Sequence, residues 1–276
     1  MNRVITAFKE HKEFSNGKFW DANRLYLNKN ISSPPHYADT VEIIVDHGAV
    51  GNIHIGGAHY EFSGSGAYFI APDTVHSMMY KKCDGYVTIL KLAVTPLKEF
   101  LDISAMIKSN GYGMDDLPHI VPEAANATEL EQLFAGSESP FNVLAATLTF
   151  FGELSKTASM YLPKMSVQQS ADLRRLIKWA EQHCTNKPSL AEAAKIMGYS
   201  KNYFCRLFKD ATGVTFLDYL NALRIDRACV ELKKGMSVSE VCYFCGFESV
   251  SYFAKLFKRT VGVTPKKFVS MTELNK

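Results

Sequence analysis

The sequence predicts an α+β, multidomain chain in which a β-barrel with trailing helices precedes an all-α domain. Residues 19–95 are rich in β-branched and aromatic residues and are divided by Gly, Pro and Asp, as short strands are. After Thr95 the apolar residues recur at helical spacing, and from Lys164 onward basic residues outnumber acidic ones. These observations predict three segments, 1–95, 96–163 and 164–276.

The composition is that of a globular protein and excludes several other classes. Of the 276 residues 47% are hydrophobic and 21% are charged, which excludes a disordered chain, a collagen-like chain and a coiled-coil rod. No apolar run approaches the length of a membrane span, and the N-terminus lacks the pattern of a secretion signal. We therefore expect a cytoplasmic protein with no membrane partner, whose six cysteines stay reduced.

The charge is unevenly divided along the chain. Residues 1–163 contain 12 Lys and Arg against 18 Asp and Glu, a net charge of −6. Residues 164–276 contain 19 against 10, a net charge of +9. This asymmetry favours a C-terminal segment that binds a polyanion, although a basic surface that only faces water is the alternative.

Strands are expected over 41–48, 51–64, 66–72 and 86–94, with a hairpin turn at Gly56-Gly57. Helices are expected over 95–109, 126–134 and 140–162. The last of these carries a wide apolar stripe, which either packs on the barrel of the same chain or joins two protomers. Its members are Phe141, Leu144, Leu148, Phe151 and Leu154. Residues 162–170 are expected to be a linker.

The C-terminal segment contains an internal repeat that starts at Leu190 and again at Val238. Each copy has a capping box, a short helix, a Gly suited to a left-handed turn, and a Ser before a second helix. This order predicts two helix-turn-helix units. The matched positions are Ser189 and Ser237, Glu192 and Glu240, Gly198 and Gly246, and Ser200 and Ser249.

The second helix of each unit has an apolar face and a polar one. Phe204, Leu207 and Phe208 are expected to face inward in the first unit, as are Phe253, Leu256 and Phe257 in the second. The opposite faces carry Lys201, Asn202, Arg206 and Lys209, and Ser251, Lys255 and Lys258. Between the units, Thr215–Lys234 predicts one helix of about 30 Å, close to the ~34–36 Å between successive major-groove faces of DNA.

Cys242 and Cys245 form a CxxC pair, which can indicate redox or metal chemistry. The repeat aligns these two positions with Ala194 and Met197, which are small or apolar residues. Packing in the core is therefore the favoured interpretation.

The stretches GYSKNYFCRLFKDATGVTFLDYLNALRIDRA and GFESVSYFAKLFKRTVGVTPKKF resemble the DNA-binding domain of the arabinose-regulator (AraC/XylS) family of bacterial transcription factors. The resemblance covers residues 173–269 and implies double-stranded promoter DNA as a partner, a homodimer, and RNA polymerase as a partner if the protein is an activator. It implies base-reading positions at Asn202, Cys205 and Arg206, and at Val250, Ser251 and Lys255.

The N-terminal segment resembles a cupin barrel, as found in sensor domains of that family. GAYFIAPDTVH fits the second cupin motif except for Thr74, and Ala38 replaces the second His of the first motif. The resemblance leaves His36, Glu42 and His76 as effector-binding candidates. These three could bind a small molecule without metal, hold a metal ion, or be ordinary barrel residues; the first interpretation is favoured, with no cofactor.

Together these patterns predict a one-component transcription regulator with no catalytic residues, which binds promoter DNA in response to a small molecule such as a sugar. Two alternatives stay open at this point. One is a metal-dependent cupin enzyme with an accessory DNA-binding domain. The other is a constitutive DNA-binding protein whose barrel is an assembly scaffold.

Overall fold

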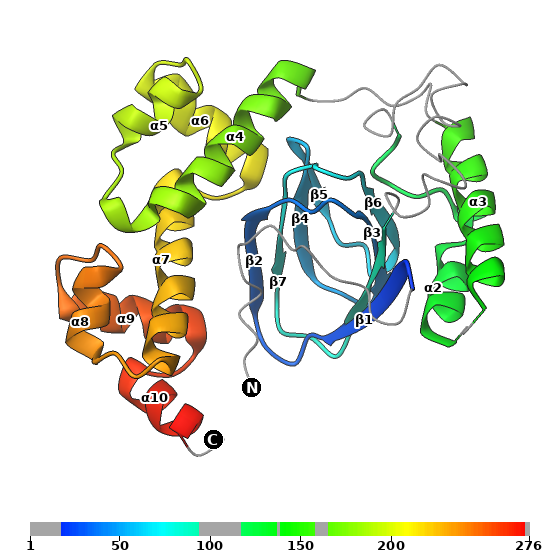
Figure 1. Cartoon of the computed structure of the whole chain (residues 1–276). Helices are drawn as coiled ribbons and strands as arrows, with labels where there is room; N and C mark the ends of the chain where they lie inside the picture. The colour runs from blue at the N-terminus through cyan, green and yellow to red at the C-terminus, as the bar shows by residue number, and fades with distance from the viewer. Residues whose placement is uncertain (1–17, 94–116, 137–138, 158–164, 274–276) are drawn as a thin grey trace. The chain divides into compact units, whose positions relative to one another are not determined.

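The structure is a computed structural model that describes residues 18–93, 117–136, 139–157 and 165–273 (Figure 1). The chain divides into two compact units, which contain Tyr37–Ser170 and Ala171–Lys276. The strands that precede Tyr37 are hydrogen-bonded into the sheets of the N-terminal unit. The helix expected over 95–109 and the boundaries expected near residues 95 and 163 lie outside the described residues. Within those residues, no helix has the length and apolar character needed to cross a membrane.

The described residues of the N-terminal unit form eight strands in two four-stranded sheets with the orders β1-β8-β3-β6 and β2-β7-β4-β5. The predicted strands are confirmed, but the closed barrel is not, because no ladder joins the two sheets among the described strands. The sheets are held together by apolar side chains instead. The strands are β1 Trp20–Tyr26, β2 Ile31–His36, β3 Val41–His47, β4 Gly51–Ile55, β5 Ala58–Glu61, β6 Ser65–Ile70, β7 His76–Tyr80 and β8 Tyr86–Leu92.

Strand β3 is buried on both faces, which explains its nearly continuous apolar sequence. Alternate residues of a strand point to opposite faces of the sheet. Val41, Ile43 and Val45 therefore pack in one cluster with the helices α2 and α3, whereas Ile44 packs in a second cluster with residues of the other sheet, such as Ile53. The first sheet thus separates two apolar cores.

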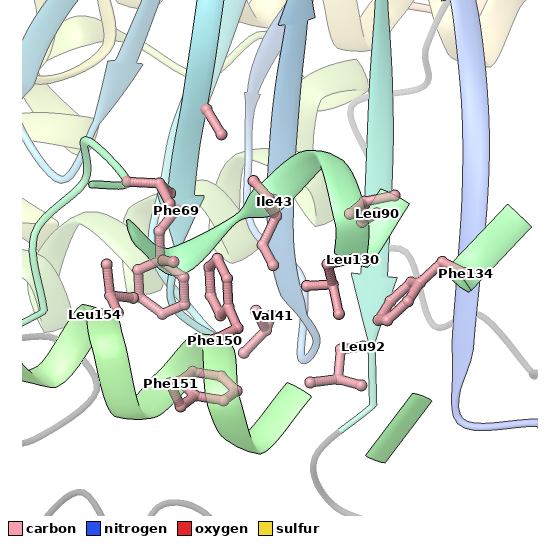
Figure 2. Packing of buried hydrophobic residues seen from close by; sticks show 14 of the residues in the cluster. Val41, Ile43, Phe69, Leu90, Leu92, Leu130, Phe134, Phe150, Phe151 and Leu154 are labelled. Carbon is pink, nitrogen blue, oxygen red and sulfur yellow. The ribbon is translucent and has the colours of Figure 1, made fainter. Parts of the chain in front are cut away.

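Two helices cover the first sheet: α2 (Ala127–Gly136) and α3 (Pro140–Lys156), after a short turn η3 (Glu123–Ala125). Figure 2 shows Phe150, Phe151 and Leu154 of α3 facing Phe69 of the sheet. The ring centroids of Phe69 and Phe151 are 6.0 Å apart, in an edge-to-face arrangement. Packing on the same chain is therefore confirmed for part of the apolar stripe.

The C-terminal unit is all helical, as predicted. Its elements are α4 Val167–His183, η5 Cys184–Asn186, α5 Leu190–Ile196, α6 Lys201–Thr212, α7 Phe216–Lys233, α8 Val238–Phe244, α9 Val250–Val261 and α10 Pro265–Glu273. The prediction of a linker up to Ser170 is wrong, because α4 already begins at Val167. The Ser166 hydroxyl accepts a hydrogen bond from the Gln169 amide, and the Gln169 side chain accepts one from the Ser166 amide. This capping box starts the helix inside the segment that was expected to be a linker.

Cys242 and Cys245 are fully buried in an apolar cluster of the C-terminal unit, so the packing interpretation is confirmed. Burial raises the pKa of Cys245 to about 12, which keeps its thiol protonated near neutral pH. All six cysteines are free thiols.

Candidate functional site

The first helix-turn-helix unit consists of α5, the turn at Gly198, and α6. The Ser189 hydroxyl accepts a hydrogen bond from the Glu192 amide at 3.1 Å, and the Glu192 carboxylate accepts one from the Ser189 amide at 2.7 Å. Gly198 adopts φ +72°, the left-handed conformation that the sequence predicts. Ser200 precedes α6 as expected, but its side chain makes no capping hydrogen bond.

Helix α6 buries one face and exposes the other. Phe204 and Phe208 are completely buried and lie edge-to-face with Phe216, each with ring centroids 5.3 Å away, whereas Leu207 is only half-buried. Four predicted site residues are exposed on the other face, and Cys205 is half-buried beside them. The four are Lys201, Asn202, Arg206 and Lys209.

The second unit repeats this geometry in α8, the turn at Gly246, and α9. Ser237 and Glu240 form the predicted capping box, and Gly246 adopts φ +83°. Here the Ser249 hydroxyl does cap its helix, because it accepts a hydrogen bond from the Tyr252 amide at 3.3 Å.

The outer face of α9 exposes Ser251, Lys255 and Lys258, opposite the fully buried Phe253 and Phe257. Val250, the remaining predicted residue, is half-buried and packs against the apolar cluster of this unit. The structure therefore gathers the predicted residues of α9 on one face except for Val250, which is turned partly toward the core.

Helix α7 connects the two helix-turn-helix units. It also carries buried polar residues that the sequence analysis did not single out. The Arg224 guanidinium donates to the Cys184 carbonyl at 2.8 Å, and its centre lies 5.7 Å from the Phe247 ring centroid. The Asn221 amide donates to the Tyr252 hydroxyl of α9 at 3.3 Å. Asn221 and Arg224 lie three positions apart, as residues on one face of a helix do, and this spacing was the available signal. They tie the second helix-turn-helix to α7 and η5.

In the N-terminal unit, the three effector-binding candidates come together. His36 on β2, Glu42 on β3 and His76 at the start of β7 each offer a ligand atom, and these atoms lie within 4.8 Å of one another. All three residues are buried, with exposed fractions of 1–4%. Two buried imidazoles beside one carboxylate can bind a polar ligand or a metal ion.

Lys91 is a fourth member of this cluster, which sequence reasoning missed. Its ammonium group lies 2.9 Å from one oxygen of Glu42, and the other oxygen lies 3.2 Å from Nε2 of His76. Lys91 is the register partner of Glu42 across β8 and β3. The apolar run around Lys91 was the only signal, since a lone Lys in a buried strand needs a partner.

Comparison with known proteins agrees with the helical geometry. Residues 193–271 match a helix-turn-helix domain family. The chain is 27% identical over 250 residues to the transcriptional activator RhaS of Enterobacter sp. (strain 638), covering 85% of this chain and 86% of that protein. It is 30% identical over 115 residues to the transcriptional activator AarP of Providencia stuartii, covering 41% of this chain and 85% of that protein.

Among solved structures, ToxT from Vibrio cholerae is similar to this chain at 17% identity and a TM-score of 0.49, covering 92% of this chain and 99% of that chain. The similarity to AarP spans most of that protein, and the residues that match the helix-turn-helix family include both units described above from Ala193 onward. The chain belongs to the arabinose-regulator (AraC/XylS) family of helix-turn-helix transcription regulators.

Proposed function

We propose that this protein is a transcriptional activator that binds promoter DNA with both helix-turn-helix units and responds to a small molecule bound by its N-terminal unit. It acts as a regulator and not as an enzyme, and residues 1–95, 96–163 and 164–276 serve as sensor, connector and DNA-binding domain. The relatives that match most of this chain are transcriptional activators by name, which supports activation and hence a contact with RNA polymerase.

The exposed polar faces of α6 and α9 are the observation that carries this proposal. Arg206 suits guanine and Asn202 suits adenine, because these side chains can make paired hydrogen bonds to those bases. Cys205 and Val250 would contact thymine methyl groups. Ser251 and Lys255 occupy the base-reading positions of α9, where a hydroxyl can bond to a base edge and Lys suits guanine. Phosphate contacts suit the remaining residues, which are Lys201, Lys209 and Lys258.

Helix α7 supplies the spacing between the two reading helices. Its 18 residues span about 27 Å, which is near the ~34–36 Å between successive major-groove faces. The Thr215 hydroxyl caps its first turn by accepting a hydrogen bond from the Asp218 amide at 3.1 Å. A rigid connector of this length lets one protomer place two helices in adjacent stretches of the groove.

Dimerisation through α3 fits the part of its apolar stripe that the sheet does not cover. Phe141 is 81% exposed, and Leu144 and Leu148 are half-buried. Leu144 and Leu148 pack partly against the same core as Phe151 and Leu154, so the apolar surface of the stripe left uncovered is Phe141 and the outer parts of Leu144 and Leu148. We therefore assign the outer side of α3 to a homodimer contact.

The effector is assigned to the cluster of His36, Glu42 and His76. The family resemblance favours a sugar or a related metabolite. A carboxylate accepts hydrogen bonds and an imidazole donates or accepts them, so these residues can recognise hydroxyl groups.

The decisive experiment is the salt dependence of promoter binding by the full chain. Each phosphate neutralised by Lys or Arg contributes about −0.9 to the slope of log affinity against log salt. We expect a steep linear decrease, and Lys209→Ala should reduce the slope by about one phosphate contact. Binding that is undetectable, or insensitive to salt, in a folded protein contradicts the proposal.

A further inference from the structure

Arg206 on α6 is the side chain of the first unit best suited to pair with guanine, and it is exposed to solvent. An exposed arginine has many rotamers and loses that freedom when it makes paired hydrogen bonds to a base. A neighbour that already holds the guanidinium in the reading direction reduces this loss. The surroundings of Arg206 therefore affect how well the unit distinguishes one base from another.

The ring of Tyr203 is such a neighbour. The central carbon of the Arg206 guanidinium lies 5.7 Å from the centroid of the Tyr203 ring, within the roughly 6 Å over which a cation is attracted to an aromatic face. The two residues are three positions apart on α6, so they lie on the same side of the helix. A ring face attracts the guanidinium without using its N–H donors, which stay available for a base.

The Tyr203 ring is itself held in place. Tyr199 lies edge-to-face with it, with ring centroids 4.9 Å apart and an interplanar angle of 71°. Tyr199 follows the turn at Gly198, where its amide donates a hydrogen bond to the Ala194 carbonyl at 3.0 Å. This bond belongs to the left-handed turn that ends α5. The turn therefore positions Tyr199, and Tyr199 supports the ring on which Arg206 lies.

The second unit uses its matching aromatic residues differently. Tyr252 takes the place of Tyr203, and its hydroxyl accepts a hydrogen bond from Asn221 of α7 at 3.3 Å. The neighbouring Phe247 ring lies 5.7 Å from the guanidinium centre of Arg224, which is also on α7. These two rings connect the second unit to α7, whereas the corresponding rings of the first unit contact a base-reading side chain. The contact on α6 is therefore not a consequence of the fold that the two units share.

We propose that Tyr203, supported by Tyr199, is a positioning residue that holds Arg206 in the direction in which its guanidinium meets a guanine. This inference rests on the proposed function, in which Arg206 reads a base. The ring acts through Arg206 and not through a contact of its own with a base. It therefore affects the preference for one DNA sequence over another more than the affinity for DNA in general.

The test measures the binding of the full chain to two duplexes at one salt concentration. One duplex is selected by the wild-type chain from a random-sequence pool, and the other has the same bases in shuffled order. Tyr203→Leu removes the aromatic face and should reduce the ratio of the two affinities by about 2–5-fold, the range that corresponds to an exposed cation–π contact. Tyr203→Phe keeps the aromatic face and should retain the wild-type ratio.

The Arg206→Ala background separates positioning from other roles. Without a guanidinium to hold, Tyr203→Leu should leave the ratio of affinities unchanged, because the coupling between two residues disappears when one of them is removed. A merely structural role would weaken binding to both duplexes by the same factor, with or without Arg206. Tyr243→Leu is the matched control, since Tyr243 on α8 is 61% exposed and lies outside both reading helices.

The wild-type chain offers a second readout, which does not require the Leu variant to fold. In the free protein, the side-chain protons of Arg206 should show upfield NMR shifts, because they lie over the face of an aromatic ring. Shifts like those of an arginine in solvent would overturn the proposal.

An unchanged ratio in Tyr203→Leu, or the same loss of ratio in the Arg206→Ala background, would also overturn it. If the wild type selects no sequence from the pool, the proposed function is contradicted as well. If the wild type selects a sequence and Tyr203→Leu keeps the full preference, only the positioning role is wrong.

Discussion

The two helix-turn-helix units share one sequence pattern but differ in how closely their turns are packed. Gly198 and Gly246 adopt nearly the same backbone angle, with φ +72° and +83°. A Cβ atom added to Gly246 would lie 2.7 Å from the Thr185 carbonyl oxygen, whereas one added to Gly198 would have no atom within 4 Å. The repeat therefore fixes the local backbone, and the surroundings decide how much each position contributes to stability.

The exposed faces of the two second helices also differ in chemistry. Helix α6 presents Asn202 and Arg206, which can each make paired hydrogen bonds to a base. Helix α9 presents Ser251 and Lys255 at its base-reading positions, but Val250 is turned partly toward the core, and Lys258 suits a phosphate contact. We expect the first unit to supply most of the sequence preference and the second to supply mainly affinity.

The largest expected effect concerns the buried aromatic core, which the two helix-turn-helix units share. Phe204→Ala and Phe253→Ala should each reduce the free energy of unfolding by about 3–5 kcal/mol, because both rings are completely buried. Urea unfolding followed by Trp179 fluorescence measures this in a Trp20→Phe background, since the protein has two tryptophans and Trp20 lies in the other unit. If either variant loses less than about 1 kcal/mol of unfolding free energy, the cores of the two helix-turn-helix units are not equivalent.

The second-largest expected effect concerns the packing of the turn, in which the two helix-turn-helix units differ. Gly246→Ala combines a left-handed backbone with a clash against a carbonyl group, so it should cost about 2–4 kcal/mol of unfolding free energy. Gly198→Ala has only the backbone penalty and should cost about 1 kcal/mol. The same Trp179 measurement compares the two variants, and equal losses would show that the second turn is no more tightly packed than the first.

The repeat explains why the C-terminal unit could be predicted so closely from sequence. Caps, left-handed glycines and helical periodicity act between residues a few positions apart, so each leaves a local pattern. The start of α4 was missed because a Ser followed three residues later by Gln, at Ser166 and Gln169, was not interpreted as a capping box. Whether a helix-start serine makes its hydrogen bond depends on side-chain geometry, as Ser200 and Ser249 show.

The N-terminal unit was less predictable because its decisive contacts join distant strands. His36, Glu42 and His76 became candidates only because their spacing resembles the cupin motifs. Lys91 pairs with Glu42 across β3 and β8, which are separated by four strands in the chain order. The two separate sheets likewise depend on strand pairing that no local pattern determines.

The third effect sharpens the difference in chemistry between α6 and α9. Arg206→Ala should cost about 1–3 kcal/mol of binding free energy on promoter DNA and less on random DNA, because it removes a base contact. Lys258→Ala should weaken binding to both DNAs evenly, as loss of a phosphate contact does. Titration of each variant against promoter and random duplexes at one salt concentration measures this. Identical loss patterns for the two variants would remove the proposed division of roles.

The smallest effect compares the caps of α6 and α9. Ser249 accepts a hydrogen bond from the Tyr252 amide at 3.3 Å, so Ser249→Ala should reduce the free energy of unfolding by about 1 kcal/mol. Ser200 occupies the same position before α6 without that bond, and Ser200→Ala should change the free energy by only about a few tenths of a kcal/mol. Ser189→Ala and Ser237→Ala, which each break a complete capping box, provide matched references of about 1 kcal/mol. A loss for Ser200→Ala as large as for these references would mean that its hydroxyl caps α6 in solution, and that the two units are more alike than their structures indicate.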